Sequence, residues 1–128
     1  MSKKKDRTLR LKRFEAAETA RKVASLEAMI RDLEALATAL SQQIATEEER
    51  SQVKDPRRAN YSMVAMAAAA RRSKLIISLV DLRSKLEVAK REHDNVDGQV
   101  RDLELALGVP SENTNLAQVK RDKAPGPL

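Results

Sequence analysis

The chain has 128 residues, with one Phe, one Tyr, no Trp and three Gly, so it lacks the bulky side chains that usually fill a globular core. Charged residues make up 34% of it and hydrophobic residues 41%, with a formal net charge of +6. Such a composition is typical of long helices and coiled coils. The absence of cysteine excludes disulfides, thiolate nucleophiles and cysteine-based metal sites.

The positive charge is concentrated at the N-terminus. Residues 1–22 contain nine Lys or Arg and three acids, whereas the rest of the chain contains 16 of each sign. A terminal basic cluster suits an acidic protein, a nucleic acid or an anionic membrane surface, or serves solubility alone. Neither a transmembrane helix nor a secretory signal is expected, because apolar runs are short throughout the chain and none follows Lys3–Lys5.

The first predicted element is a helix over residues 5–51. Its apolar positions alternate in spacing between three and four residues, which keeps one face turned toward a partner helix and implies left-handed supercoiling. This face, the helix-one part of the interhelical seam, comprises Leu9, Lys12, Ala16, Thr19, Val23, Leu26, Ile30, Leu33, Ala37, Leu40 and Ile44.

A loop is predicted over residues 52–60. Pro56 cannot continue a helix from its N-terminal side and biases Asp55 away from helical geometry. Asp55 could cap a new helix with Pro56 in its first position; alternatively, Asn60 or Ser62 is the cap.

The second predicted helix covers residues 61–107 and ends at Gly108, with Pro110 just beyond. Residues 109–128 are predicted to form a disordered tail. The helix-two part of the seam comprises Tyr61, Ala65, Ala68, Arg72, Leu75, Leu79, Leu82, Leu86, Ala89, His93, Val96, Val100, Leu103 and Leu107.

The two seams have equal length around one short loop. Folding the chain about residue 56 places position i opposite about 112 − i, so that Ile30 meets Leu82. We therefore predict an all-α protein in which residues 1–108 form a long antiparallel two-helix coiled-coil hairpin, each arm about 70 Å long.

Residues that could support catalysis are scarce. His93, the single histidine, lies on the seam and is interpreted as a polar residue that helps to set the register. Glu47-Glu48-Glu49 is interpreted as a solvated charge run, and no phosphate-binding glycine motif occurs. We expect a binding protein that is not an enzyme and has no cofactor or metal.

Apolar residues beside the seam widen the apolar surface near the loop. They are Met29 and Leu36 on the first helix and Met66, Ala70, Ile77 and Val80 on the second. Hairpin pairing places Leu36 near Ile76 and Ile77. This surface either broadens the seam or docks a partner.

Several segments resemble the alphaproteobacterial form of the flagellar export protein FliJ family. They are Thr8–Phe14, Arg21–Ile30, Glu47–Arg50 followed by Asp55-Pro56, then Tyr61, and Ala67–Arg72. The resemblance covers about residues 7–107 and departs from the family pattern at Ser62, where a proline is expected.

The resemblance implies a cytoplasmic stalk of the flagellar type III protein export apparatus, at the cytoplasmic face of the inner membrane, that supports export and motility. Its implied partners are the hexameric export ATPase, the export gate membrane protein and export chaperones. Arg10, Leu11, Lys12, Arg13 and Phe14 are assigned to the ATPase ring. Met29, Leu36, Tyr61, Met66 and Ile77 are assigned to the gate or a chaperone.

Three alternatives stay open. A virulence type III secretion stalk would have a similar shape and similar partners. A nucleic-acid-associated coiled coil would bind phosphates through its basic end, although Glu15 and Glu18 within that end disfavour it. A membrane-associated scaffold would need an amphipathic face rimmed by Lys and Arg.

Overall fold

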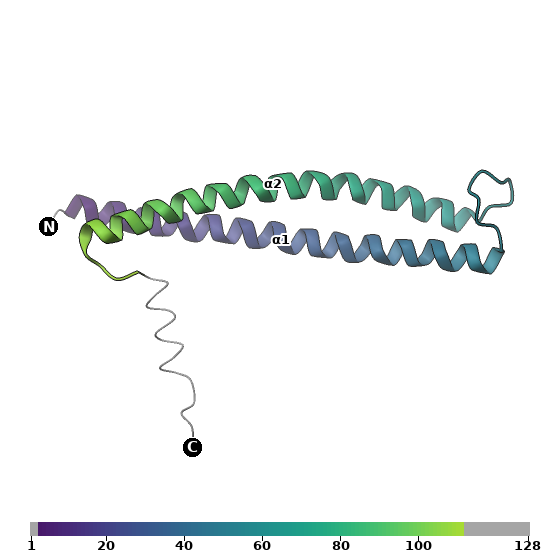
Figure 1. Ribbon diagram of the computed structural model, residues 1–128, viewed down its shortest axis with the longest axis horizontal. Helices are drawn as coiled ribbons and strands as arrows, with labels where there is room; N and C mark the ends of the chain where they lie inside the picture. The colour runs from purple at the N-terminus through teal and green to yellow at the C-terminus, as the bar shows by residue number, and fades with distance from the viewer. Residues whose placement is uncertain (1–2, 112–128) are drawn as a thin grey trace, which may run out of the picture. The chain divides into compact units, whose positions relative to one another are not determined.

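The computed structural model describes residues 3–111, which form two long helices: α1, Lys3–Ser51, and α2, Met63–Leu107 (Figure 1). The predicted all-α helical hairpin is confirmed. Both helices end at the predicted residues, whereas α2 begins two residues later than expected. Of the predicted tail, residues 112–128 lie outside the described residues.

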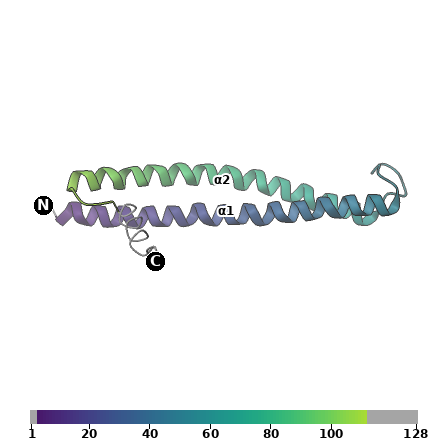
Figure 2. The ribbon, with the colours of Figure 1, turned by 60° about the horizontal axis from the view of Figure 1, so that its bottom comes forward.

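The described part of the chain divides into two compact units, one formed by Lys22–Lys90 and the other by residues 3–21 with 91–111. Within each unit, the α1 and α2 segments lie side by side in both views of the ribbon (Figures 1 and 2). Contacts in each unit follow the predicted pairing: Ile30 packs in a cluster with Leu82, and Thr19 bonds His93. The segments are therefore antiparallel.

The Lys22–Lys90 unit has an apolar core drawn from both helices. Ile30, Leu79 and Leu82 are buried together, and Leu26, Leu33 and Leu86 pack against them. Each such side chain contributes roughly 1.5–3 kcal/mol when it is fully removed from water. Seam residues therefore stabilise this unit, as the alternating spacing of three and four predicts.

The seam of the other unit is more polar. Leu9, Val96 and Val100 are buried, but the seam layer next to Val96 contains a hydrogen bond of 2.8 Å between Thr19 Oγ1 and His93 Nδ1. The Thr19 hydroxyl also lies 2.9 Å from the Ala16 carbonyl, so it links the histidine ring to the backbone of α1. This directional pair is expected to favour one register, and the predicted place of His93 on the seam is confirmed.

Ser62 caps the N-terminus of α2. Its hydroxyl accepts a hydrogen bond from the Ala65 amide at 3.1 Å, three residues into the turn, as a helix N-cap does. Asp55 instead starts a turn, where its carboxylate accepts from the Arg57 amide at 3.0 Å and its carbonyl accepts from the Arg58 amide at 3.1 Å. Of the capping alternatives, Ser62 is the one observed.

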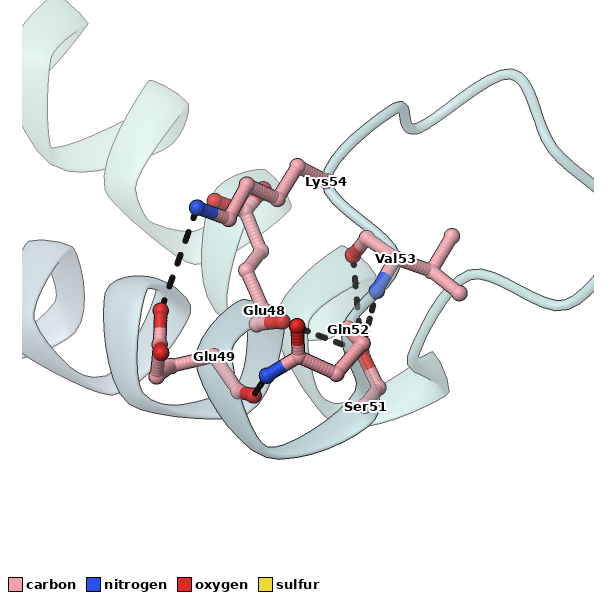
Figure 3. A network of polar contacts seen from close by, with 6 residues as sticks. All are labelled: Glu48, Glu49, Ser51, Gln52, Val53 and Lys54. Atoms are coloured by element: carbon pink, nitrogen blue, oxygen red, sulfur yellow. Dashed lines mark hydrogen bonds and ion pairs between the residues drawn. The ribbon is translucent and has the colours of Figure 1, made fainter.

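The C-terminus of α1 is tied by side chains rather than by glycine (Figure 3). Gln52 has φ of 59°, a left-handed conformation that is costly for a residue with a side chain. The side-chain amide of Gln52 donates to the Glu49 carbonyl at 2.7 Å, and the Ser51 hydroxyl accepts from the backbone amide of Val53 at 3.3 Å. The bond to Glu49 satisfies a carbonyl that the C-terminus of a helix leaves unpaired.

Helix α2 ends in a Schellman motif. Gly108 has φ of +66°, its amide donates to the Leu105 carbonyl at 3.3 Å, and the Val109 amide donates to the Glu104 carbonyl at 3.1 Å. The predicted glycine stop is confirmed.

A substitution at Gly98 tests whether α2 is a regular helix at this position. A Cβ added there would meet no atom within 4 Å, and alanine lowers the conformational entropy of the unfolded chain. Gly98→Ala is expected to raise the free energy of unfolding by about 0.5–1 kcal/mol. Urea denaturation followed by circular dichroism measures this change, and a destabilised variant would contradict the regular helix at this position.

Candidate protein-interaction surfaces

The N-terminal surface of α1 presents two large apolar side chains beside basic ones. Leu11 and Phe14 are 69% and 65% exposed, and Arg7 and Arg10 are exposed on the same side of the helix, since residues three and four apart are neighbours. We call these four residues the N-terminal face. The structure brings together three predicted site residues here: Arg10, Leu11 and Phe14.

Lys12 and Arg13 are engaged within the chain instead. Lys12 Nζ lies 3.2 Å from Glu15 Oε2. Arg13 donates to Glu104 Oε2 at 2.8 Å and to the Pro110 carbonyl at 3.3 Å, and the Glu104 side chain is only 6% exposed. Arg13 therefore joins α1 to the end of α2, and we leave it out of the contact surface that we propose.

The Arg13–Glu104 pair borders a shallow cavity of about 310 Å³. Three alanines of α1 and mostly polar side chains of α2 line it; the lining residues are Arg13, Ala16, Ala17, Ala20, His93, Asp97, Val100, Arg101, Glu104 and Ser111. Over residues 3–111, no group of three or more His, Asp or Glu side chains could hold a metal ion. We assign no reaction to this cavity.

Tyr61 was expected to meet a partner, but it lies in the core. It is 6% exposed and packs with Val53 and Ala65, and its hydroxyl donates to Glu48 Oε2 at 2.7 Å. Ser62 also donates to Glu47, at 3.4 Å. The acidic run predicted as a solvated face therefore holds the start of α2, apart from Glu49, which lies 3.8 Å from Lys54 (Figure 3).

The bond to Glu48 raises the pKa of Tyr61 above its ordinary value, because only the protonated hydroxyl can donate it; burial and the negative charge of Glu48 act in the same direction. As pH rises, Tyr61 loses its proton in the unfolded chain before it does so in the folded chain. The stability that this group contributes is therefore fully present below about pH 10 and is lost as pH rises through the raised pKa. Because Tyr61 is the single tyrosine and Trp is absent, tyrosinate absorbance reports this group alone.

We expect its midpoint above about 10 in the folded protein and a return to about 10 in urea. Glu48→Gln should lower the folded midpoint, since it removes the charge and keeps an acceptor. Equal midpoints in the folded and unfolded chains would contradict the hydrogen bond.

The four other residues of the second predicted site do not form one surface. The ion pair between Glu34 and Arg83, at 3.8 Å, marks one side of the seam. Leu36 is two residues, or about 200°, from Glu34 and so faces the other side, whereas Ile76 precedes Arg83 by two turns and shares its side. The expectation that Leu36 lies near Ile76 and Ile77 is therefore wrong.

Met29 and Leu36 are nevertheless half exposed, seven residues apart on one side of α1. Met66 and Ile77 are exposed on α2. Sequence reasoning missed two features: the Arg13–Glu104 pair and the exposed Leu105. Leu105 lies two positions after the seam residue Leu103 and two before Leu107, which is the signal that could have placed it on the surface.

No helix among residues 3–111 is both long and apolar enough to cross a membrane. Comparisons with protein-family profiles, with curated proteins and with solved structures find no match to this chain.

Proposed function

We propose that this protein is a stalk of a type III protein export apparatus of the flagellar kind and works by binding other proteins rather than by catalysis. Its first partner is the hexameric export ATPase, bound through the N-terminal face. Its place of action is the cytoplasmic side of the membrane that holds the export gate. The sequence resemblance to the FliJ family motivates this assignment.

The single structural observation that supports it is the exposure of Leu11 and Phe14 beside Arg7 and Arg10. Exposed aromatic and aliphatic side chains next to arginine are the composition of binding hot spots. The basic side chains suit an acidic rim and would speed association. Lys12, paired with Glu15, contributes charge at the edge of this contact.

A second contact is proposed on α1 through Met29 and Leu36. Both are about half exposed, and both lie on the side of the seam away from Glu34. An apolar pair seven residues apart suits a helix or groove of the export gate or of a chaperone. Tyr61 is not part of this contact, since its ring is buried.

The assignment is tested by light scattering of the purified export ATPase with and without the full chain. We expect hexamers to form at about one chain per six ATPase subunits, as a single stalk in a ring requires. An ATPase whose mass is unchanged by equimolar chain would overturn the proposal. If the chain instead binds duplex DNA with a steep dependence on salt, the nucleic-acid alternative takes its place.

A further inference from the structure

The cavity that Arg13 borders lies within a single unit of the chain. Its α1 side is formed by three small side chains, Ala16, Ala17 and Ala20, of which the last two are exposed. Its volume is about 310 Å³, and a protein cavity of about 150 Å³ can hold a benzene molecule. The cavity therefore has room for one or two apolar side chains of moderate size.

The charged side chains around this cavity are paired with one another. Arg101 donates to Asp97 at 2.7 Å, and Arg13 donates to Glu104 at 2.8 Å. Because each pair is neutral overall, the lining presents no excess of charge to a ligand. An uncharged segment with an apolar side chain is the occupant that such a lining suits.

The chain that leaves α2 is led to the same cavity. Gly108 turns it out of the helix, Val109 is half-buried, and the Pro110 carbonyl accepts from Arg13 at 3.3 Å. Ser111, the last described residue, is itself part of the lining. The residues that follow in the sequence therefore start from the cavity.

We propose that the segment Asn113–Val119 folds back into this cavity, with Leu116 against Ala17 and Ala20. The segment contains no charged residue, which matches the paired charges of the lining. Leu116 comes five residues after Ser111, a span that an extended chain covers in about 17 Å. The three alanines occupy only about 6 Å of α1, so the segment is long enough. The inference does not rest on the proposed function.

Arg13 gives a polar reason for the same placement. Its Nε is buried and has no acceptor within the described residues 3–111, and a buried donor without a partner is unfavourable. The backbone carbonyls of the segment, or the side-chain carbonyl of Asn113, can supply the acceptor that this N–H lacks.

The segment also has an advantage over any separate molecule, because it is tethered beside the cavity. A short flexible tether gives an effective concentration of the order of millimolar. Occupation by the segment is therefore independent of protein concentration, whereas occupation by a second copy increases with it. The disorder predicted for the tail is then confined to the residues after Val119.

Disulfide formation tests the contact directly, since the chain has no native cysteine. In dilute full-length chain, Ala17→Cys with Leu116→Cys should form an internal disulfide about tenfold faster than Ala106→Cys with Leu116→Cys. Ala106 is exposed and lies about 200° around α2 from Glu104, yet it is only five residues from Ser111. A tail without a preferred position would reach both cysteines.

Two outcomes of this experiment would overturn the proposal. Equal rates in the two double variants would show that the segment does not prefer the cavity. Disulfides that form mainly between chains, at a rate that rises with protein concentration, would assign the cavity to a second copy instead.

Tryptic cleavage after Lys120 tests the contact without a new covalent bond. Docking of the preceding residues slows this cleavage, because the protease acts on the undocked form. Leu116→Ser in the full chain is expected to raise the cleavage rate about tenfold. Ala124→Ser, a change of similar size beyond the segment, should leave it unaltered. Unaltered cleavage of the Leu116→Ser chain would contradict docking.

Blocking the cavity from α1 gives the converse test. Ala20→Lys places a charge against Leu116 and should accelerate cleavage after Lys120 as Leu116→Ser does. Ala106→Lys adds the same charge to the far side of α2 and is the matched control. Circular dichroism should show both variants fully helical, because both alanines are exposed and lysine is a good helix former. Equal cleavage rates in these two variants would separate the segment from the cavity and refute the proposal.

Discussion

Replacing Leu11 and Phe14 together by alanine is expected to weaken binding of the chain to the export ATPase by about a hundredfold or more. The reason is that large side chains in the centre of an interface often contribute about 2 kcal/mol each, and every 1.4 kcal/mol corresponds to a tenfold change in Kd. Isothermal titration of the ATPase with each chain measures the change.

The fold should survive this double substitution. Both side chains are exposed, and alanine is the strongest helix former, so circular dichroism should match that of the unaltered chain. Leu105→Ala, which removes another exposed side chain from the same unit, is the matched control and should bind normally. Unchanged affinity in the double variant would remove the N-terminal face from the proposal.

Leu79→Ala is expected to lower the free energy of unfolding by about 2–4 kcal/mol. Leu79 is buried with Ile30 and Leu82, and a leucine-to-alanine change in a core loses both transfer free energy and packing. Since small domains are stable by only about 5–15 kcal/mol, the loss is large. Urea denaturation at low protein concentration measures it.

Val88→Ala is the matched control for this prediction. Val88 lies in the same helix and unit but is 43% exposed, so its truncation should cost less than about 1 kcal/mol. Equal losses in both variants would show that the Ile30 cluster does not stabilise the unit more than the surface does.

The elements and their pairing could be predicted because they follow from a periodic pattern. The alternation of three and four residues identified both faces of the seam, including the polar positions Thr19 and His93. Gly108 gave the end of α2 because a left-handed residue is needed there. These features depend on local spacing alone, which a sequence displays directly.

The candidate site was harder to predict because a shift of one residue along a helix can move a side chain from the core to the surface. Tyr61 lay on the extrapolated seam but was assigned to a partner, whereas Glu48 supplies its hydroxyl with a part-buried acceptor inside the chain. Arg13 looked like part of a basic patch because its partner, Glu104, is distant in sequence. Leu36 was placed on the wrong side because the rule that position i lies opposite 112 − i ignores the direction of side chains.

The Arg13 contact also changes how charge should be tested. Reversing Arg13 would leave Glu104, a buried carboxylate, beside another acid, so lost binding could reflect lost structure. Arg10 is exposed, and Arg10→Glu is therefore the charge reversal that reports on binding. Its effect should fall on the association rate and shrink at high salt.

If one chain acts inside a ring of export ATPase subunits, as we propose, phosphate release by the ATPase should depend on it. The chain is titrated into the ATPase while turnover is followed, with the Leu11→Ala, Phe14→Ala chain as the comparison. Turnover should rise to a plateau near one chain per six subunits, and the variant should need far more protein to reach it. Turnover that stays at its basal rate with excess folded chain would contradict the stalk function.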